Sequence, residues 1–161
     1  MSKIKDAFKN LYAKMVGEDA TPQFIARGWA IGMFYGCLIP FGFQLLLSIP
    51  TAIILRGSKI GATLGTFITN HFTVFAIYPA QCYAGSKILG NGLSYESIKE
   101  AMFKVIDQHT WDSLLQCGGD LVASFFVGGS LLAAVMTPIT YFAVRQIVIK
   151  KRLRDARSQG V

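Results

Sequence analysis

Six polar side chains lie where two largely apolar stretches of the sequence are interrupted, and they are the residues best suited to chemistry. They are Gln44, Thr66, Thr69, Asn70, His71 and Thr73. Amide and hydroxyl groups in an apolar environment need hydrogen-bond partners, because leaving them unpaired is costly. Two interpretations remain open: the groups form a small polar site for a headgroup, an ion or water, or they cap the ends of broken helices.

His71 is the one ionisable side chain within these stretches apart from Lys87 near the end of the second. Its imidazole suits a proton acceptor or a ligand. No second histidine or acidic residue accompanies it, so we expect no metal site and no cofactor. The sequence also has no phosphate loop, nucleophile elbow or acidic pair in an apolar stretch, and we therefore do not expect an enzyme.

The composition indicates a membrane protein. The chain has 161 residues, of which 52% are hydrophobic and 16% are charged, whereas soluble domains average about 25% charged residues. The net charge is +7, and the basic residues flank apolar stretches, where they favour the cytoplasmic side and anionic lipid. We therefore expect an anionic phospholipid partner and no nucleic acid. Three cysteines do not suggest a disulfide framework.

The two apolar stretches, 28–55 and 60–88, are each too long for one straight span. A helix over 28–55 would be ~42 Å long, against a hydrocarbon core of ~30 Å. The predicted helix breaks are Pro40, Gly42, Pro79 and residues 69–73. Unwound backbone at membrane depth must face protein or a wet cavity. The predicted fold is an all-α integral membrane protein with tandem broken or re-entrant helical hairpins, at least one transmembrane helix and amphipathic interfacial helices.

An internal duplication is predicted within a membrane core of residues 21–89. A shift of 29 residues relates 27–55 to 56–89 and gives eight identities in 24 positions, where typical residue frequencies would give about two. Each copy carries glycines spaced by four, which form a smooth helix face that permits close packing. They are Gly28, Gly32 and Gly36 in the first copy and Gly57, Gly61 and Gly65 in the second. These stripes would pack on each other or form a subunit interface in a homo-oligomer.

Arg27 and Arg56 occupy equivalent positions at the start of the two copies. Their guanidinium groups suit a phosphate headgroup, and the alternative role is to anchor the chain at the membrane surface.

The remaining segments are predicted to lie on, cross or leave the membrane. Residues 1–20 form an amphipathic surface segment, after which Thr21 caps a helix with Pro22 at its first position. Residues 90–118 form an acidic amphipathic interfacial segment, 119–149 a transmembrane helix and 150–161 a basic tail. Charge favours one path, in which the first stretch enters and returns, the second crosses outward and the third crosses back. If both copies are hairpins, residues 90–118 are instead cytoplasmic.

The chain resembles a bacterial membrane-protein family known as domain of unknown function 2062 over about residues 21–89. The resemblance rests on Pro22, on Ala26, Gly28, Ala30, Gly32, Phe34 and Gly36, on Pro40, Gly42 and Gln44, on Gly65, Thr66, Thr69, Asn70 and Thr73, and on Tyr78 and Tyr83. Two positions depart from the family pattern: Gln23 replaces an acidic residue and His71 replaces proline. The resemblance implies a small polytopic membrane protein without an established activity. Some members are fused to glycosyltransferases, which implies lipid-linked sugars.

The sequence therefore predicts a multi-pass protein of the bacterial inner membrane. The leading hypothesis is permeation or lipid-headgroup handling through a midplane polar site formed by the two broken segments, in a homo-oligomer. The alternative is a non-catalytic membrane scaffold or assembly partner, for example of a glycosyltransferase.

Overall fold

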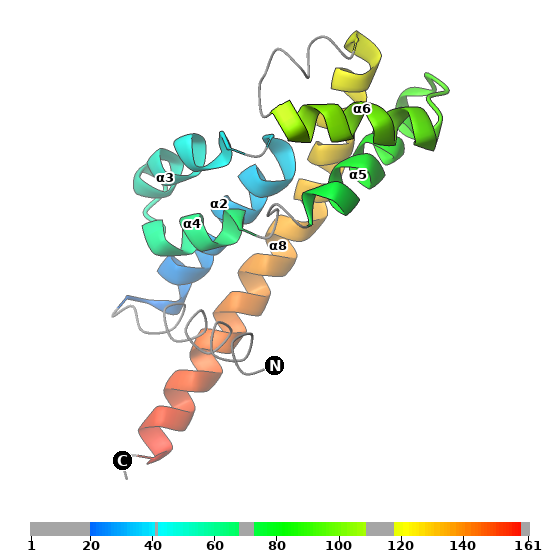
Figure 1. Cartoon of the computed structure of the whole chain (residues 1–161). Coiled ribbons are helices and arrows are strands. Elements are labelled where there is room, and N and C mark those ends of the chain that lie inside the picture. Colours follow the sequence, from blue (N-terminus) through cyan, green and yellow to red (C-terminus); the bar gives the residue numbers. More distant parts are fainter. Residues whose placement is uncertain (1–19, 41, 68–72, 109–117, 159–161) are drawn as a thin grey trace.

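The computed structural model describes residues 20–40, 42–67, 73–108 and 118–158, and these contain helices and no strands (Figure 1). The helices are α2 (Pro22–Leu38), α3 (Gln44–Ile54), α4 (Lys59–Thr66), α5 (Val74–Leu89), α6 (Tyr95–Gln108) and α8 (Gly119–Ser158). The all-helical prediction is confirmed for these residues. Residues 1–19, most of the predicted surface segment, lie outside them.

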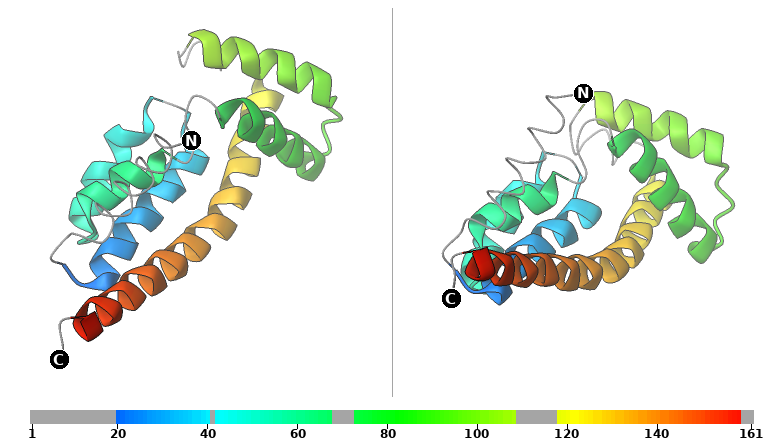
Figure 2. Two further views of the ribbon diagram at one scale, coloured as in Figure 1. Left: turned by 60° about the horizontal axis from the view of Figure 1, so that its bottom comes forward. Right: turned by 90° about the horizontal axis from the view of Figure 1, so that it is seen from below.

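Helix α8 is the longest element, and α2 and α5 pack directly on it. Its 40 residues would extend ~60 Å at 1.5 Å per residue, and Figure 2 shows it as one long, curved helix. It is the one helix of the described segments that is long and apolar enough to cross a membrane. The predicted transmembrane segment 119–149 and the first part of the predicted basic tail form one helix, which continues without interruption to Ser158. Arginine and lysine are good helix formers, so the basic tail extends the helix.

Helix α2 begins as predicted. The backbone N–H of Phe24 donates to Oγ1 of Thr21 at 3.3 Å, and Pro22 occupies the first turn. The helix packs antiparallel along α8, from the level of Val148 to that of Gly129. Ile25 lies in a buried cluster with Val148, whereas Cys37, near the other end of α2, packs with residues around Ala133.

The chain turns back after α2, at the break predicted from Pro40 and Gly42. Both lie between α2 and α3, and Gly42 has a φ of +101°, which favours glycine because it has no Cβ. Helix α3 then returns beside α2. The hydroxyls of Tyr35 and Thr51 lie 2.9 Å apart, and Nη1 of Arg27 donates to the carbonyl of Leu55 at 3.2 Å. The two ends of residues 27–55 are thereby joined.

The two glycine stripes meet inside the molecule, in the contact between α2 and α4. A Cβ added at Gly28 would lie 2.2 Å from the carbonyl oxygen of Ser58, and one at Gly32 would lie 2.2 Å from that of Ala62. From the other side, a Cβ at Gly65 would lie 2.6 Å from the Trp29 carbonyl oxygen. The contacts advance in the same direction along both helices, so α2 and α4 run parallel with their backbones in close approach.

The other three glycines of the stripes make different contacts. Gly61 also faces α2, because an added Cβ would lie 2.8 Å from Cδ1 of Trp29. Gly57 lies in the turn before α4, where an added Cβ would lie 2.9 Å from the backbone nitrogen of Gly28. The carbonyl of Gly36 accepts a hydrogen bond from Gln44.

Residues 56–89 are arranged differently from residues 27–55, because α4 and α5 do not pack on each other as α2 and α3 do. Helix α5 packs on the N-terminal half of α8 and on α6 (Figures 1 and 2). Its buried cluster includes Tyr78, Ile98 and Phe125, one from each of these helices. The predicted helix break at Pro79 is wrong, because Pro79 lies buried inside α5. One missing backbone hydrogen bond does not outweigh the packing of α5 on α8.

The exterior of the described helices is unusually apolar. On α3, Leu46 is 70% exposed and Ile54 is 78% exposed, and on α8 Phe142 is 59% exposed. The charges of α8 lie at its ends, and residues 121–144 contain none. Large apolar side chains exposed in such number indicate an interface with lipid or with another protein.

Candidate functional site

Gln44, the first residue of α3, reaches back to the end of α2. Its side chain is only 3% exposed, and Nε2 donates to the carbonyls of Gly36 at 3.2 Å and Ile39 at 3.0 Å. The last carbonyls of a helix have no partner within the helix, and a side-chain amide can satisfy them. The break after α2 is therefore held by the amide that the sequence analysis singled out.

Tyr78, a residue of α5, also reaches the end of α2. Its hydroxyl lies 3.5 Å from Nε2 of Gln44 and 3.4 Å from the Ile39 carbonyl oxygen, to which it donates. Its ring packs edge-on against Phe125, with centroids 5.0 Å apart. The sequence analysis did not include Tyr78 in the site. The available signal was a phenol in an apolar stretch, since a buried tyrosine hydroxyl usually finds a partner.

We call the junction of Gln44, Tyr78 and the Ile39 carbonyl the polar centre. Thr66, at the end of α4, lies beside it: Gly42, Gln44, Leu45, Thr66 and Phe67 line a cavity of about 70 Å³. The hydroxyl of Thr66 donates to the Thr63 carbonyl at 2.7 Å. The end of α4, where the second break begins, therefore lies beside the break between α2 and α3.

The remaining predicted polar residues divide into two groups. Thr73 immediately precedes α5, and its carbonyl accepts the backbone N–H groups of Ala76 at 3.1 Å and Ile77 at 2.9 Å. Thr69, Asn70 and His71 lie outside the described residues.

The polar centre lies partway along the uncharged part of α8. A Cβ added at Gly129 would lie 2.9 Å from the carbonyl oxygen of Cys37, so the end of α2 is level with Gly129. At 1.5 Å per residue this is ~24 Å along α8 from Arg145 and ~14 Å from Asp120. The centre is therefore remote from the charged ends of α8.

The chemistry of the centre is that of neutral hydrogen bonding. It combines an amide, a phenol, a threonine hydroxyl and backbone carbonyls, without a charged group among the residues just described. A cavity of this size admits water or a small polar group. Within the described segments, no cluster of three or more His, Cys, Asp or Glu side chains could hold a metal ion.

Arg27 and Arg56 are brought together at the opposite end of the α2–α3 pair. Arg27 donates to the Leu55 carbonyl, next to Arg56, and its Nε donates to the Gln23 carbonyl at 3.4 Å. Arg56 is exposed and has a φ of +51°. Arg152 of α8 donates to the Ala20 carbonyl close by. Positive charge thus gathers where α2 begins, α3 ends and α8 ends.

The model of a family described as "Uncharacterized protein conserved in bacteria (DUF2062)" matches residues 5–157, well beyond the 21–89 region on both sides. No curated protein and no solved structure matches the chain.

Proposed function

Because the chain belongs to this family of uncharacterised proteins conserved in bacteria, for which no activity is described, we propose a function from its own geometry. We propose an integral membrane protein that passes or holds a small polar group, as a solute or as part of a lipid headgroup, at the polar centre. The observation that carries the proposal is the meeting of Gln44 and Tyr78, from two separately broken segments, inside an apolar exterior.

The surface supports placement in a membrane. Large apolar side chains of α3 and α8 are exposed, and residues 121–144 of α8 are uncharged over ~36 Å, enough to cross a hydrocarbon core of ~30 Å. The positive end, with Arg27, Arg56 and Arg152, is proposed to face the cytoplasm of a bacterial cell at its inner membrane. There its guanidinium groups would meet anionic phospholipid.

The path of the chain along α8 supports a re-entrant first copy. Helix α2 rises from the positive end to the level of Gly129, and α3 returns to it. Helix α4 rises again beside α2, and α5 continues along α8 to Asp120, whose carbonyl accepts Nδ2 of Asn91 at 3.3 Å. The proposed topology is thus a re-entrant α2–α3 pair, a crossing made of α4 and α5, and a return through α8. Helix α6 then lies on the outer side.

A broken crossing explains why the polar groups are where they are. The ends of α2 and α4 leave backbone carbonyls unpaired at a depth where lipid offers no hydrogen bonds. Gln44 and Tyr78 donate hydrogen bonds to such carbonyls at the end of α2. The same N–H and O–H groups can donate instead to a hydroxyl, a phosphate or a water molecule that reaches the polar centre. Broken helices that meet at mid-depth form the substrate sites of several transporter folds.

The test is a flux measurement in vesicles that contain the purified chain. Scrambling of a fluorescent phospholipid and release of a small solute are measured for wild type, Tyr78→Phe and Gln44→Leu. Tyr35→Phe is the matched control, since it removes the same hydroxyl from the α2–α3 pair but away from the centre. Tyr78→Phe and Gln44→Leu are expected to lower one flux at least fivefold, and Tyr35→Phe to change it less than twofold. If all three variants have the wild-type flux, the polar centre takes no part in transport.

A second candidate is a non-transporting scaffold that holds a membrane enzyme. It is favoured by the small cavity and by the bonds of Gln44 to backbone carbonyls, which suit a capping role. The partner surface would be the exposed face of α3, because the glycine stripes are occupied within the chain. A homo-oligomer would need such an outer face as well.

Complementation of a deletion strain separates the two candidates. Leu46→Trp keeps an apolar side chain towards lipid but enlarges the α3 face, where Leu46 is 70% exposed. A scaffold predicts failure with Leu46→Trp and rescue with Tyr78→Phe. The polar-centre proposal predicts the reverse.

A further inference from the structure

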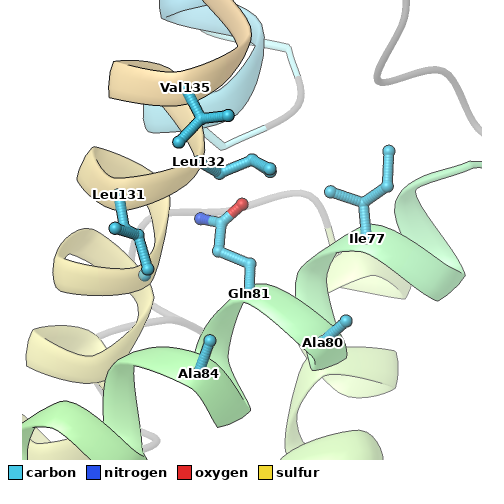
Figure 3. Close-up of a pocket in the computed structure, with 8 residues that line it drawn as sticks. Ile77, Ala80, Gln81, Ala84, Leu131, Leu132 and Val135 are labelled. Atoms are coloured by element: carbon cyan, nitrogen blue, oxygen red, sulfur yellow. The ribbon is translucent and has the colours of Figure 1, made fainter.

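A second hollow, lined by none of the residues of the polar centre, lies between α5 and α8 (Figure 3). It is an open groove of about 390 Å³, and its floor and rim include Ala80 and Ala84 of α5 and Leu131 and Val135 of α8. Leu131 and Val135 are each about half exposed and belong to the apolar exterior of α8. The volume is in the range of small-molecule sites, and Gln81 provides the one polar side chain of its lining.

Gln81 has one satisfied end and one unsatisfied end. Its side chain is 4% exposed, and Nε2 donates to the carbonyl of Phe125 at 3.0 Å. The carbonyl of Phe125 can only accept, so the amide nitrogen must face it and the amide oxygen must face away. That oxygen, Oε1, has no hydrogen-bond partner, and Figure 3 shows it directed into the groove towards Leu132.

The backbone holds Gln81 in this position. A Cβ added at Gly128 would lie 1.8 Å from the Gln81 carbonyl oxygen, and one at Gly129 would lie 2.6 Å from Nε2. Two adjacent glycines of α8 therefore contact Gln81, Gly128 at its backbone and Gly129 at its side-chain amide. A buried carbonyl oxygen without a hydrogen-bond donor is destabilising, so a ligand that supplies a donor removes an unfavourable contribution that the free protein already carries.

The groove specifies the chemistry of its occupant. Its lining carries no charge and offers one acceptor and no free donor, so a phosphate or carboxylate would be repelled by Oε1. Gly128 to Val135 also include the middle of the uncharged residues 121–144 of α8. At that depth a charged headgroup is excluded, whereas a hydroxyl on a long apolar chain is admitted.

We propose that the groove between α5 and α8 binds a neutral lipid alcohol, with its hydroxyl donating to Oε1 of Gln81 and its chain against Ala80, Leu131 and Val135. The hydroxyl enters by displacing the side chain of Leu132, which lies over the amide oxygen. This site uses the membrane placement proposed above but none of the residues of the polar centre, so either can fail without the other.

The experiment measures binding of hexadecanol and of hexadecyl methyl ether to the full-length chain in nanodiscs. The two probes have the same chain, but the ether has no donor. One hydrogen bond to a buried acceptor is expected to give the alcohol a Kd roughly 3–10-fold below that of the ether. Gln81→Met keeps the shape of the side chain and removes the acceptor, so the two probes should then bind equally.

Ala80→Leu supplies a second variant, because Ala80 is exposed on the rim and its enlargement fills the groove without entering the core. It is expected to weaken both probes at least tenfold. Equal affinities for alcohol and ether in wild type would overturn the proposal. So would a preference for the alcohol that persists in Gln81→Met, or affinities for both probes that Ala80→Leu leaves unchanged, since the binding site would then lie elsewhere.

Discussion

Replacement of Gly28 by alanine tests the backbone contact between α2 and the start of α4. The added Cβ would lie 2.2 Å from the Ser58 carbonyl oxygen, more than 1 Å short of the 3.4 Å at which ordinary contact begins. The obstructing atom belongs to the backbone and cannot rotate aside. The start of α4 must therefore move away from α2, which also stretches the 3.0 Å hydrogen bond from the Ser58 N–H to the Phe24 carbonyl.

The expected loss of stability follows from three contributions. Overpacking of a close contact costs about 1–3 kcal/mol, and weakening one hydrogen bond costs up to about 1 kcal/mol. Alanine in a helix interior is favoured over glycine by about 0.5–1 kcal/mol. The net destabilisation of Gly28→Ala is therefore about 2 kcal/mol, which for a chain of this size lowers Tm by roughly 4–8 °C.

The assay is thermal unfolding of the purified chain, followed by circular dichroism in one detergent. Gly119→Ala is the matched control, because an added Cβ there would meet no atom within 4 Å. It is expected to leave Tm within about 2 °C of wild type. The reasoning is refuted if Gly28→Ala unfolds at the same temperature as Gly119→Ala, because α2 and α4 would then not be in backbone contact.

Three further predictions follow from the fold. Gly128→Ala, whose Cβ would lie 1.8 Å from a carbonyl oxygen of α5, should separate α5 from α8 and lower Tm by at least as much as Gly28→Ala in the same assay. Thr21→Ala removes the cap of α2 and should cost about 1 kcal/mol in chemical denaturation, and Thr21→Ser should restore it. In a cysteine-free background, a membrane-impermeant maleimide should label Lys59→Cys and Arg152→Cys from the cytoplasmic side and Glu96→Cys from the opposite side; labelling of all three from one side would contradict the proposed topology.

Much of the local structure is readable in the sequence because its causes act within a few residues. Thr21 and Pro22 begin α2 through a side-chain cap and a fixed φ. Pro40 and Gly42 end it, since one lacks a donor and the other adopts a φ of +101°. Local reasoning also has a limit at Pro79, where packing on α8 holds a helix that proline alone would weaken.

The divergence of the two copies was not readable in the same way. Residues 39–43 separate α2 from α3, and a shift of 29 residues places them on 68–72, between α4 and α5. The duplication of residues 27–55 and 56–89 remains a prediction, but the helices of the first copy pair with each other while α5 leaves for α8. That choice depends on which surfaces fit over long sequence separations, and no local preference encodes it.

The class of the molecule was readable in its sequence: apolar helices, the break at Pro40 and Gly42, the cap of α2, the basic ends and the spacing of glycines. Which glycines face each other, that Tyr78 completes the polar centre and that Gln81 keeps an unpaired oxygen at an apolar groove became apparent only from the packing of distant helices. The physical reason is range. Caps, turns and hydrophobic periodicity are set by neighbours in the chain, whereas the partner of a buried amide or of a bare backbone is set by whichever distant helix can approach most closely.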